Sequence, residues 1–393
     1  MVLNGAFENA FGGKTVLVTG HTGFKGSWLT LWLHELGARV IGYSLEPPTA
    51  PSLFELCHLS GHIVDVRGDV RDLAHLEQTV AEHKPSAVFH LAAQPLVLPS
   101  YQQPQETFDI NAGGTVNLLE AVRRTGAKAP VRQAVVCIAT DKVYKNREWL
   151  WGYREIDELG GHDPYSASKA MAELAVASYR QSFFSSETYQ EHQVGLASAR
   201  AGNVIGGGDW AAERLIPDLV RALVSTGSTN EKPMNLRNPG YVRPWQIVFE
   251  SLSGYLWLAA QLLGPDAPRF AEAWNFGPRQ ECAVTTQQVV EKAIDVWGQG
   301  VKPVRFPEPV RFPEPDRFHE TALLRLNGDK AANRLGWRST YDWEQAVAET
   351  MRWYRTWFER QSGSKVVDMY DVCVSQLGRY IDAARVQGLA WAG

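Results

Sequence analysis

The sequence is poor in cysteine, in charge of one sign and in long apolar runs. Its 393 residues include four scattered cysteines (Cys57, Cys137, Cys282, Cys373), which lack the spacing of a metal site or a disulfide framework. The formal net charge is -4 and no block of Lys and Arg occurs, which argues against a nucleic-acid binder. No apolar run approaches membrane-spanning length, and the N-terminus lacks a signal-peptide pattern. We therefore expect a cytoplasmic protein that binds neither nucleic acid nor membrane.

A metal-dependent mechanism also lacks its usual ligands. His319-Glu320 begins like the zinc-protease motif, but position 323 is Leu where a second His is needed. No metal site is therefore expected. The length itself argues against a single simple core, so we expect two lobes.

What the sequence does have is a glycine-rich turn between a predicted strand and a predicted helix. Residues 15–19 are apolar and β-branched, and apolar residues at helical spacing follow the turn. We expect Gly20 to make the turn, Gly23 to let the backbone approach a pyrophosphate and Gly26 to allow close helix–sheet packing. With a further strand at 39–43, the pattern predicts a dinucleotide-binding β-α-β unit.

The cofactor is expected to be NAD. No Arg follows the second predicted strand to take a 2′-phosphate, and the acidic ribose ligand is represented only by Glu46, which comes late. A carboxylate after the third strand is expected to meet the adenine amino group, and for Asp72 the alternative role is to cap the helix that follows. Cofactor contacts are predicted at the turn and after the third and fourth strands, at Gly20, Thr22, Gly23, Phe24, Lys25, Gly26, Asp69, Val70, Leu91, Ala92 and Ala93.

A second group of polar residues begins where the buried run 135–139 ends. Thr140, Asp141 and Lys142 follow that strand, at the edge where open α/β sheets bind ligands. Tyr165 and Lys169 lie four residues apart, so they share a helix face. The ammonium is expected to favour the ionised phenol and to lower its pKa. A surface Tyr beside a solvated Lys is the alternative, and the context of the neighbouring motifs argues against it.

The repeated alternation of strands and helices predicts an α/β fold, with a Rossmann-type doubly wound parallel sheet and a smaller, mixed α/β substrate-binding lobe. We expect residues 1–200 to form the NAD-binding domain, with 242–275 returning to it. Residues 201–393 are expected to form mainly the substrate lobe and C-terminal helices, including one over 364–386 with Val366 inward. The tandem repeat at 304–315 predicts an extended loop without chemistry.

Taken together, the motifs resemble the extended short-chain dehydrogenase/reductase family, and within it the CDP-glucose 4,6-dehydratases. The resemblance reaches about Trp337 and departs at Ile247, where His is usual, and at Asn327, where Asp is usual. Such departures bear on substrate affinity more than on reaction type. The motifs that carry the resemblance are at 21–29, 140–142, 164–169, 200–210, 243–246 and 319–320.

The resemblance implies a step of deoxysugar biosynthesis, in which NAD-dependent oxidation, elimination and reduction convert CDP-D-glucose to CDP-4-keto-6-deoxy-D-glucose and water. Tyr165 would take the proton of the 4-hydroxyl, Thr140 would hydrogen-bond the 4-oxygen and Lys169 would hold the nicotinamide ribose. Asp141 would be the acid at the 6-hydroxyl and Lys142 the base at C5. An ion pair with Asp141 is the alternative role for Lys142.

Substrate contacts and an assembly are also expected. The three arginines among the contacts suit a diphosphate, because a guanidinium binds such oxygens in fork geometry. The resemblance implies a homodimer joined by the helices after Asn111 and Tyr165. A sugar-nucleotide 4-epimerase and a non-catalytic NAD-binding regulator remain alternatives, and the cytosine base follows from the resemblance alone. The predicted substrate contacts are Gln94, Asn111, Asn203, Arg214, Arg237, Arg243 and His319.

Overall fold

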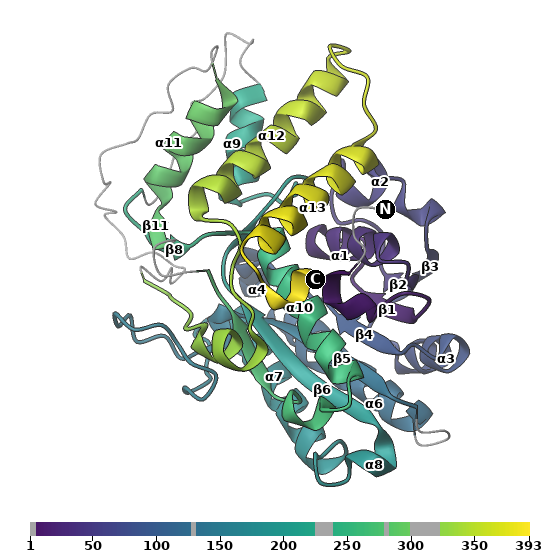
Figure 1. Cartoon of the computed structure of the whole chain (residues 1–393). Helices are drawn as coiled ribbons and strands as arrows, with labels where there is room; N and C mark the ends of the chain where they lie inside the picture. Colours follow the sequence, from purple (N-terminus) through teal and green to yellow (C-terminus); the bar gives the residue numbers. More distant parts are fainter. Residues whose placement is uncertain (1–4, 127–130, 225–238, 279–282, 299–322) are drawn as a thin grey trace.

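The computed structural model describes residues 5–126, 131–224, 239–278, 283–298 and 323–393. Seven strands of this described part form one parallel sheet (Figure 1). The strand order reverses between β1 and β4, which confirms the predicted doubly wound Rossmann-type sheet. From edge to edge the strands are β10 (Ala273–Phe276), β6 (Val194–Ala201), β5 (Gln133–Thr140), β4 (Ala87–His90), β1 (Thr15–Thr19), β2 (Arg39–Ser44) and β3 (Val64–Arg67).

Helices cover both faces of the sheet because successive side chains of each strand point to opposite faces. Val16 and Val18 of β1 belong to the core cluster that includes α1 (Phe24–Glu35) and α10 (Val248–Leu263). Leu17 belongs to the second cluster, with α3 (Leu73–His83), α6 (Gly114–Gly126) and α7 (Pro164–Ser182). With both faces buried, the carboxyl edge of the strands is left for ligands.

The remaining elements are short or lie after β6. Figure 1 shows α9, α11 and α12 gathered at one end of the molecule, near β8 and β11. The strand pairs β7–β9 and β8–β11 form two small sheets, parallel and antiparallel respectively. The bounds are α2 (Leu53–Leu56), α4 (Val97–Gln102), α5 (Pro104–Phe108), α8 (Tyr189–His192), α9 (Leu215–Val224), α11 (Thr286–Trp297), α12 (Trp343–Gln361), α13 (Met369–Val386), β7 (Val204–Ile205), β8 (Val242–Pro244), β9 (Gln246–Ile247) and β11 (Ala283–Thr285).

The last helix begins later than its apolar pattern predicts. Asp368 caps α13 by accepting from the Tyr370 backbone N–H at 2.8 Å, so the helix starts at Met369 rather than at 364. Val366, predicted to face inward, precedes the cap and is fully exposed. The expectation for Val366 was therefore wrong.

The two ends of the chain pack together. The Trp391 ring stacks on Phe7 with centroids 5.3 Å apart, and Tyr370 donates to Glu35 of α1 at 2.6 Å. Residues 369–392 therefore pack against the N-terminal segment and α1. Two later segments also join the first domain, because α10 packs on β5 and β10 pairs with β6. The division at residue 200, with later segments that return to the first domain, stays a proposal. The 304–315 repeat lies outside the described residues.

Candidate active site

The glycine turn after β1 is tight for reasons internal to the protein. Gly20 has φ +75°, and a Cβ there would lie 2.7 Å from the Ala92 nitrogen, while one at Gly26 would lie 2.0 Å from the Gly20 oxygen. A Cβ at Gly23 would meet only the Gly20 oxygen, at 3.5 Å. No packing therefore requires glycine at 23, which agrees with a need for room on the ligand side. Helix α1 has no side-chain cap, so its first N–H groups are available to an anion.

Arg67, at the end of β3, lies beside this turn although it is distant from it in the sequence. Thr22 donates to the Leu45 carbonyl at 3.1 Å, and Arg67 reaches the same carbonyl at 3.0 Å. The parallel pairing of β2 with β3 places Arg67 opposite the end of β2. Its guanidinium lies 2.9 Å from Asp65 and 3.6 Å from Glu46, so its charge is already paired. The basic group is present but balanced, which favours NAD over a 2′-phosphorylated cofactor.

The residues after β3 make defined contacts within the protein. The Asp69 carboxylate bonds Arg71, with oxygen and Nη2 2.6 Å apart, and this pairing lowers its pKa. Val70 is buried against Gly114, where a Cβ would lie 2.6 Å from the valine methyl. Asp72 accepts from the His75 N–H at 3.0 Å and caps α3, as its alternative role predicted. After β4, Leu91, Ala92 and Ala93 run beside the glycine turn, where the Ala92 N–H donates to Thr19 at 3.2 Å.

Thr140 and Asp141 meet at the carboxyl end of β5. The Thr140 hydroxyl donates to Asp141 Oδ1 at 3.0 Å and accepts from the Lys142 N–H at 3.3 Å, which starts the short turn Asp141–Val143. Asp141 is 2 % exposed, and its Oδ2 has no hydrogen-bond partner among the described residues. A Cβ at Gly202 would lie 3.2 Å from that oxygen. Burial raises the pKa of Asp141, opposed by the positive charges of Lys142 and Arg243, so the carboxyl is prepared to hold a proton.

Tyr165 and Lys169 lie on the first turns of α7, which Asp163 caps. Burial raises the pKa of Tyr165 to about 12, opposed by a hydrogen bond with Thr140. Lys169 Nζ donates to the Ile138 carbonyl of β5 at 2.8 Å, and burial lowers its pKa to about 8. The expectation that Lys169 lowers the pKa of the phenol was therefore wrong. The ammonium faces the strand, and desolvation of the buried phenol outweighs it.

Cationic side chains lie around Asp141 and Tyr165, the candidate catalytic residues. Arg214 lies 2.8 Å from Asp209 and adds positive charge near Tyr165. The pKa of Lys25 is lowered to about 8, first by burial and then by the positive charge of Arg214. Such an excess of positive charge suits ligands with two phosphates. The cations brought together are Lys25, Lys142, Lys169, Arg214 and Arg243, against the carboxylates Asp141 and Asp209.

The other predicted substrate contacts are distributed differently. Asn111 is 1 % exposed. Its side-chain amide accepts from the Gln94 backbone N–H and donates to the Gln94 backbone carbonyl and to the Ser168 hydroxyl. The Gln94 amide bonds its own loop at Leu96. The structure therefore favours positioning roles for Asn111 and Gln94 over the direct contacts expected. Asn203 lies partly exposed between β6 and β7. Arg237 and His319 lie outside the described residues.

A buried ion pair behind the site escaped sequence analysis. Glu173 and Arg200 are each 3 % exposed at the side chain and lie 2.8 Å apart, and Arg200 also donates to the Tyr144 hydroxyl at 2.7 Å. The signal was the recurrence of polar residues every fourth position from Tyr165 through Lys169 to Glu173, which places all three on one face of α7.

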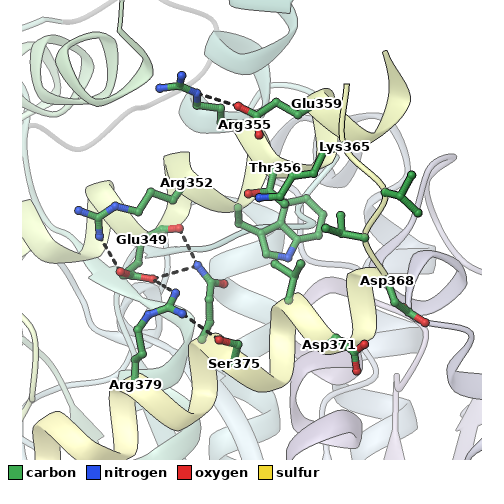
Figure 2. Close-up of a pocket in the computed structure, with 15 residues that line it drawn as sticks. Glu349, Arg352, Arg355, Thr356, Glu359, Lys365, Asp368, Asp371, Ser375 and Arg379 are labelled. Carbon is green, nitrogen blue, oxygen red and sulfur yellow. Dashed lines mark hydrogen bonds and ion pairs between the residues drawn. The ribbon is translucent and has the colours of Figure 1, made fainter. Parts of the chain in front are cut away.

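Figure 2 shows a surface pocket of about 890 Å³ between α12 and α13, apart from the candidate site. None of the predicted site residues lines it. Glu349 pairs there with Arg352 at 2.6 Å and with Arg379 at 2.8 Å, and Arg355 pairs with Glu359 at 3.2 Å. Its charges are thus largely balanced within the protein.

Within the described residues, no cluster of three or more His, Cys, Asp or Glu side chains could hold a metal ion. No helix in the described ranges is long and apolar enough to cross a membrane.

A doubly wound sheet with a glycine turn after β1 and a Tyr-x-x-x-Lys pair at its carboxyl edge defines a dehydrogenase/reductase of the short-chain class. The family model described as GDP-mannose 4,6 dehydratase matches residues 17–350, and the chain belongs to that family. It is 48 % identical to the CDP-glucose 4,6-dehydratase of Salmonella typhimurium over 89 % of this chain and 93 % of that protein.

Solved structures agree with the fold. A dTDP-glucose 4,6-dehydratase from Bacillus anthracis in complex with NAD aligns with a TM-score of 0.67 and 24 % identity, over 87 % of this chain and 96 % of that one. The UDP-glucose 4-epimerase of Thermus thermophilus in complex with NAD aligns with a TM-score of 0.68 and 25 % identity, over 87 % of this chain and 99 % of that one.

Proposed function

We propose that the chain is an NAD-dependent nucleotide-sugar 4,6-dehydratase that converts CDP-D-glucose to CDP-4-keto-6-deoxy-D-glucose and water. The observation that carries this proposal is the buried Asp141 carboxyl, with a raised pKa and one oxygen without a partner among the described residues, beside Tyr165. Elimination of a hydroxyl as water needs such an acid, and simple oxidation does not. The 48 % identity to the Salmonella enzyme supports the cytidine nucleotide.

The residues around the glycine turn fit a dinucleotide. The uncapped start of α1 would meet the pyrophosphate, with Gly23 leaving room for its approach. Asp69, Val70 and the 91–93 backbone would flank the rest of the cofactor, and Lys169 would hold the nicotinamide ribose. Bound NAD supplies the hydride acceptor for C4, the hydride donor for C6 and a positive charge beside the phenol.

The catalytic residues then have separate tasks. Tyr165 takes the proton of the 4-hydroxyl, and the Thr140 hydroxyl, which donates to Asp141 in the structure, would donate to the 4-oxygen of the substrate instead. The resulting 4-ketone acidifies the C5 proton, which Lys142 removes. Asp141 donates its proton to the departing 6-hydroxyl, and Lys142 returns its proton to C5 as hydride reaches C6. Tyr165 then releases the 4-hydroxyl proton to solvent, and Asp141 regains a proton from solvent. These roles are the ones that the family resemblance implies, and their support is the position of the groups at the carboxyl end of β5 or on the first turns of α7.

The substrate diphosphate is proposed to lie against the cations. Arg214 and Arg243 come from the second part of the chain, where Arg214 acts electrostatically on Tyr165 and Arg243 acts on Asp141. Arg237, His319 and Asn203 are retained as proposed contacts from sequence.

The test is turnover of CDP-glucose with added NAD, followed by the ultraviolet absorbance that 4-keto sugars develop in alkali. A dehydratase yields this absorbance, whereas a 4-epimerase or a non-catalytic regulator yields none. Parallel reactions with dTDP-, UDP- and GDP-sugars test the base, and faster turnover of one of them would correct the nucleotide while leaving the reaction type intact.

A cytoplasmic homodimer is also proposed. Met171 and Leu174 on α7 are 49 % and 59 % exposed, and with Ala167 they form one helical stripe beside the exposed Val116 of α6. Two such faces would form a four-helix interface. Met171→Asp with Leu174→Asp should give a monomer in sedimentation, whereas the same changes at the exposed Val386 and Leu45 should leave the dimer intact.

A further inference from the structure

A buried chain of hydrogen bonds connects the glycine turn to the catalytic helix through a histidine that the mechanism does not use. His90 ends β4 beside Thr19, its register partner in β1, and is 2 % exposed. Its Nδ1 lies 2.8 Å from the Thr19 hydroxyl and its Nε2 lies 3.1 Å from the Thr115 hydroxyl of α6. The imidazole thus bridges the strand before the turn and α6, the helix that follows Asn111.

The direction of each bond can be worked out from the donors available. The Thr115 hydroxyl donates its one hydrogen to the backbone carbonyl of Asn111 at 2.7 Å. Its oxygen therefore accepts from His90 Nε2–H. A neutral imidazole has one N–H, so Nδ1 accepts from the Thr19 hydroxyl. The Thr19 oxygen in turn accepts from the Ala92 N–H at 3.2 Å. The hydrogen bonds therefore place the proton of the neutral His90 ring on Nε2.

The chain continues to the phenol-bearing turn of α7. The Asn111 amide donates to the Ser168 hydroxyl at 2.9 Å, and Ser168 donates to the Tyr165 carbonyl at 2.7 Å. Thr19, Thr115, Asn111 and Ser168 are all at most 2 % exposed, so water does not compete for these bonds. Burial, with the nearby Lys169 charge, lowers the pKa of His90 to about 3, which keeps the direction constant at neutral pH.

We propose that His90, as its Nε2–H tautomer, is a positioning residue. It fixes the backbone at Ala92, which lines the proposed cofactor site, relative to the first turn of α7, which carries Tyr165. This proposal rests on the proposed function. Through Nδ1 and Thr19, His90 orients the backbone that follows β4. Through Nε2, Thr115, Asn111 and Ser168, it fixes the backbone of the α7 turn that carries Tyr165.

Two substitutions of His90 break the two halves of the chain separately. His90→Gln places an amide nitrogen near Nε2 and removes the acceptor for Thr19, so affinity for NAD, measured by calorimetry without sugar, should fall about tenfold while kcat at saturating NAD stays within about threefold. His90→Asn places an amide oxygen near Nδ1 and removes the donor to Thr115, so kcat should fall about ten- to a hundredfold with NAD affinity within about threefold.

A matched pair of threonines guards against misfolding at position 90. Thr115 and Thr350 are buried and both bond the carbonyl four residues earlier at 2.7 Å, but only Thr115 also accepts from a histidine. Thr115→Val should lower kcat about tenfold or more, whereas Thr350→Val should keep kcat within about twofold at a similar melting temperature.

Nitrogen NMR of the cofactor-free protein, labelled in its histidine rings, completes the experiment. The expected His90 signals are those of a neutral ring protonated on Nε2. An Nδ1–H ring, a charged ring, or a Thr115→Val variant with kcat equal to that of Thr350→Val overturns the positioning role. Absence of CDP-glucose turnover in the parent protein is a different result, which rejects the proposed reaction, while the tautomer and the NAD affinities remain measurable.

Discussion

Lys169 donates from its ammonium to the Ile138 carbonyl at 2.8 Å, so its side chain is anchored to β5. The phenol keeps a pKa raised to about 12, chiefly by burial. In the proposed mechanism, the positive charge of the nicotinamide of NAD, when bound, would favour the ionised phenol.

Tyr165→Phe removes the phenol oxygen and leaves the ring's packing. Turnover should fall by about 10²–10⁴-fold, the range for a positioned proton-transfer group, while nucleotide binding changes little. Steady-state kinetics with calorimetric binding checks this. Turnover within a few-fold of the parent would remove Tyr165 from the mechanism.

Lys142→Met keeps the length of the stem while removing the charge and the lone pair. Because oxidation at C4 precedes proton removal at C5, the variant should accumulate the near-ultraviolet absorbance of reduced nicotinamide and release almost no keto product. In deuterated water, exchange at C5 should be far slower than in the parent. If Lys142 is only an ion-pair partner of Asp141, product should form at a near-parental rate.

Asp141→Asn tests the acid by its effect on stability as well as on rate. A carboxyl whose folded pKa is raised stabilises the folded state least when ionised, so its cost is absent at low pH and grows as pH rises through the raised pKa. The variant should therefore melt higher than the parent at neutral pH, with the difference vanishing toward pH about 4. Product formation should fall about 10²–10⁴-fold. A lower melting temperature at neutral pH would show that ionised Asp141 is stabilising.

Arg200→Met leaves Glu173 buried without its partner. Stability should fall by about 3–5 kcal/mol, measured by denaturant unfolding, since an uncompensated buried charge is costly. The Glu173→Gln, Arg200→Met double variant should recover part of this loss. The Glu173 pKa is lowered, chiefly by Arg200 against desolvation, so the pair's contribution should disappear as pH falls below the ordinary glutamate range. An unfolding free energy within about 1 kcal/mol of the parent would contradict a structural role.

Local spacing was enough to predict much of the site. The glycine turn, the shared face of Tyr165 and Lys169, and the position of Asp141 after a buried strand all depend on residues within a few turns of one another. Such patterns report the backbone path directly, because helix and strand periods determine which side chains are neighbours.

Contacts between distant segments could not be predicted in this way. Arg67 reaches the end of β2 only through the pairing of β2 with β3, and the Asn111 amide turns to Ser168 because α7 packs beside it. The partner of Lys169 was also invisible, since Ile138 is 31 residues away and offers a backbone atom. His90 carried a weak signal, as a polar residue ending an apolar strand.

The most direct measurement uses CDP-glucose carrying deuterium at C4, turned over by the parent protein in ordinary water, with the product examined by NMR. The account predicts that the deuterium appears at C6 of the same 4-keto-6-deoxy sugar, with none in free reduced cofactor. Deuterium retained at C4 of an epimerised sugar, or released with the cofactor while C6 keeps its hydroxyl, would contradict it.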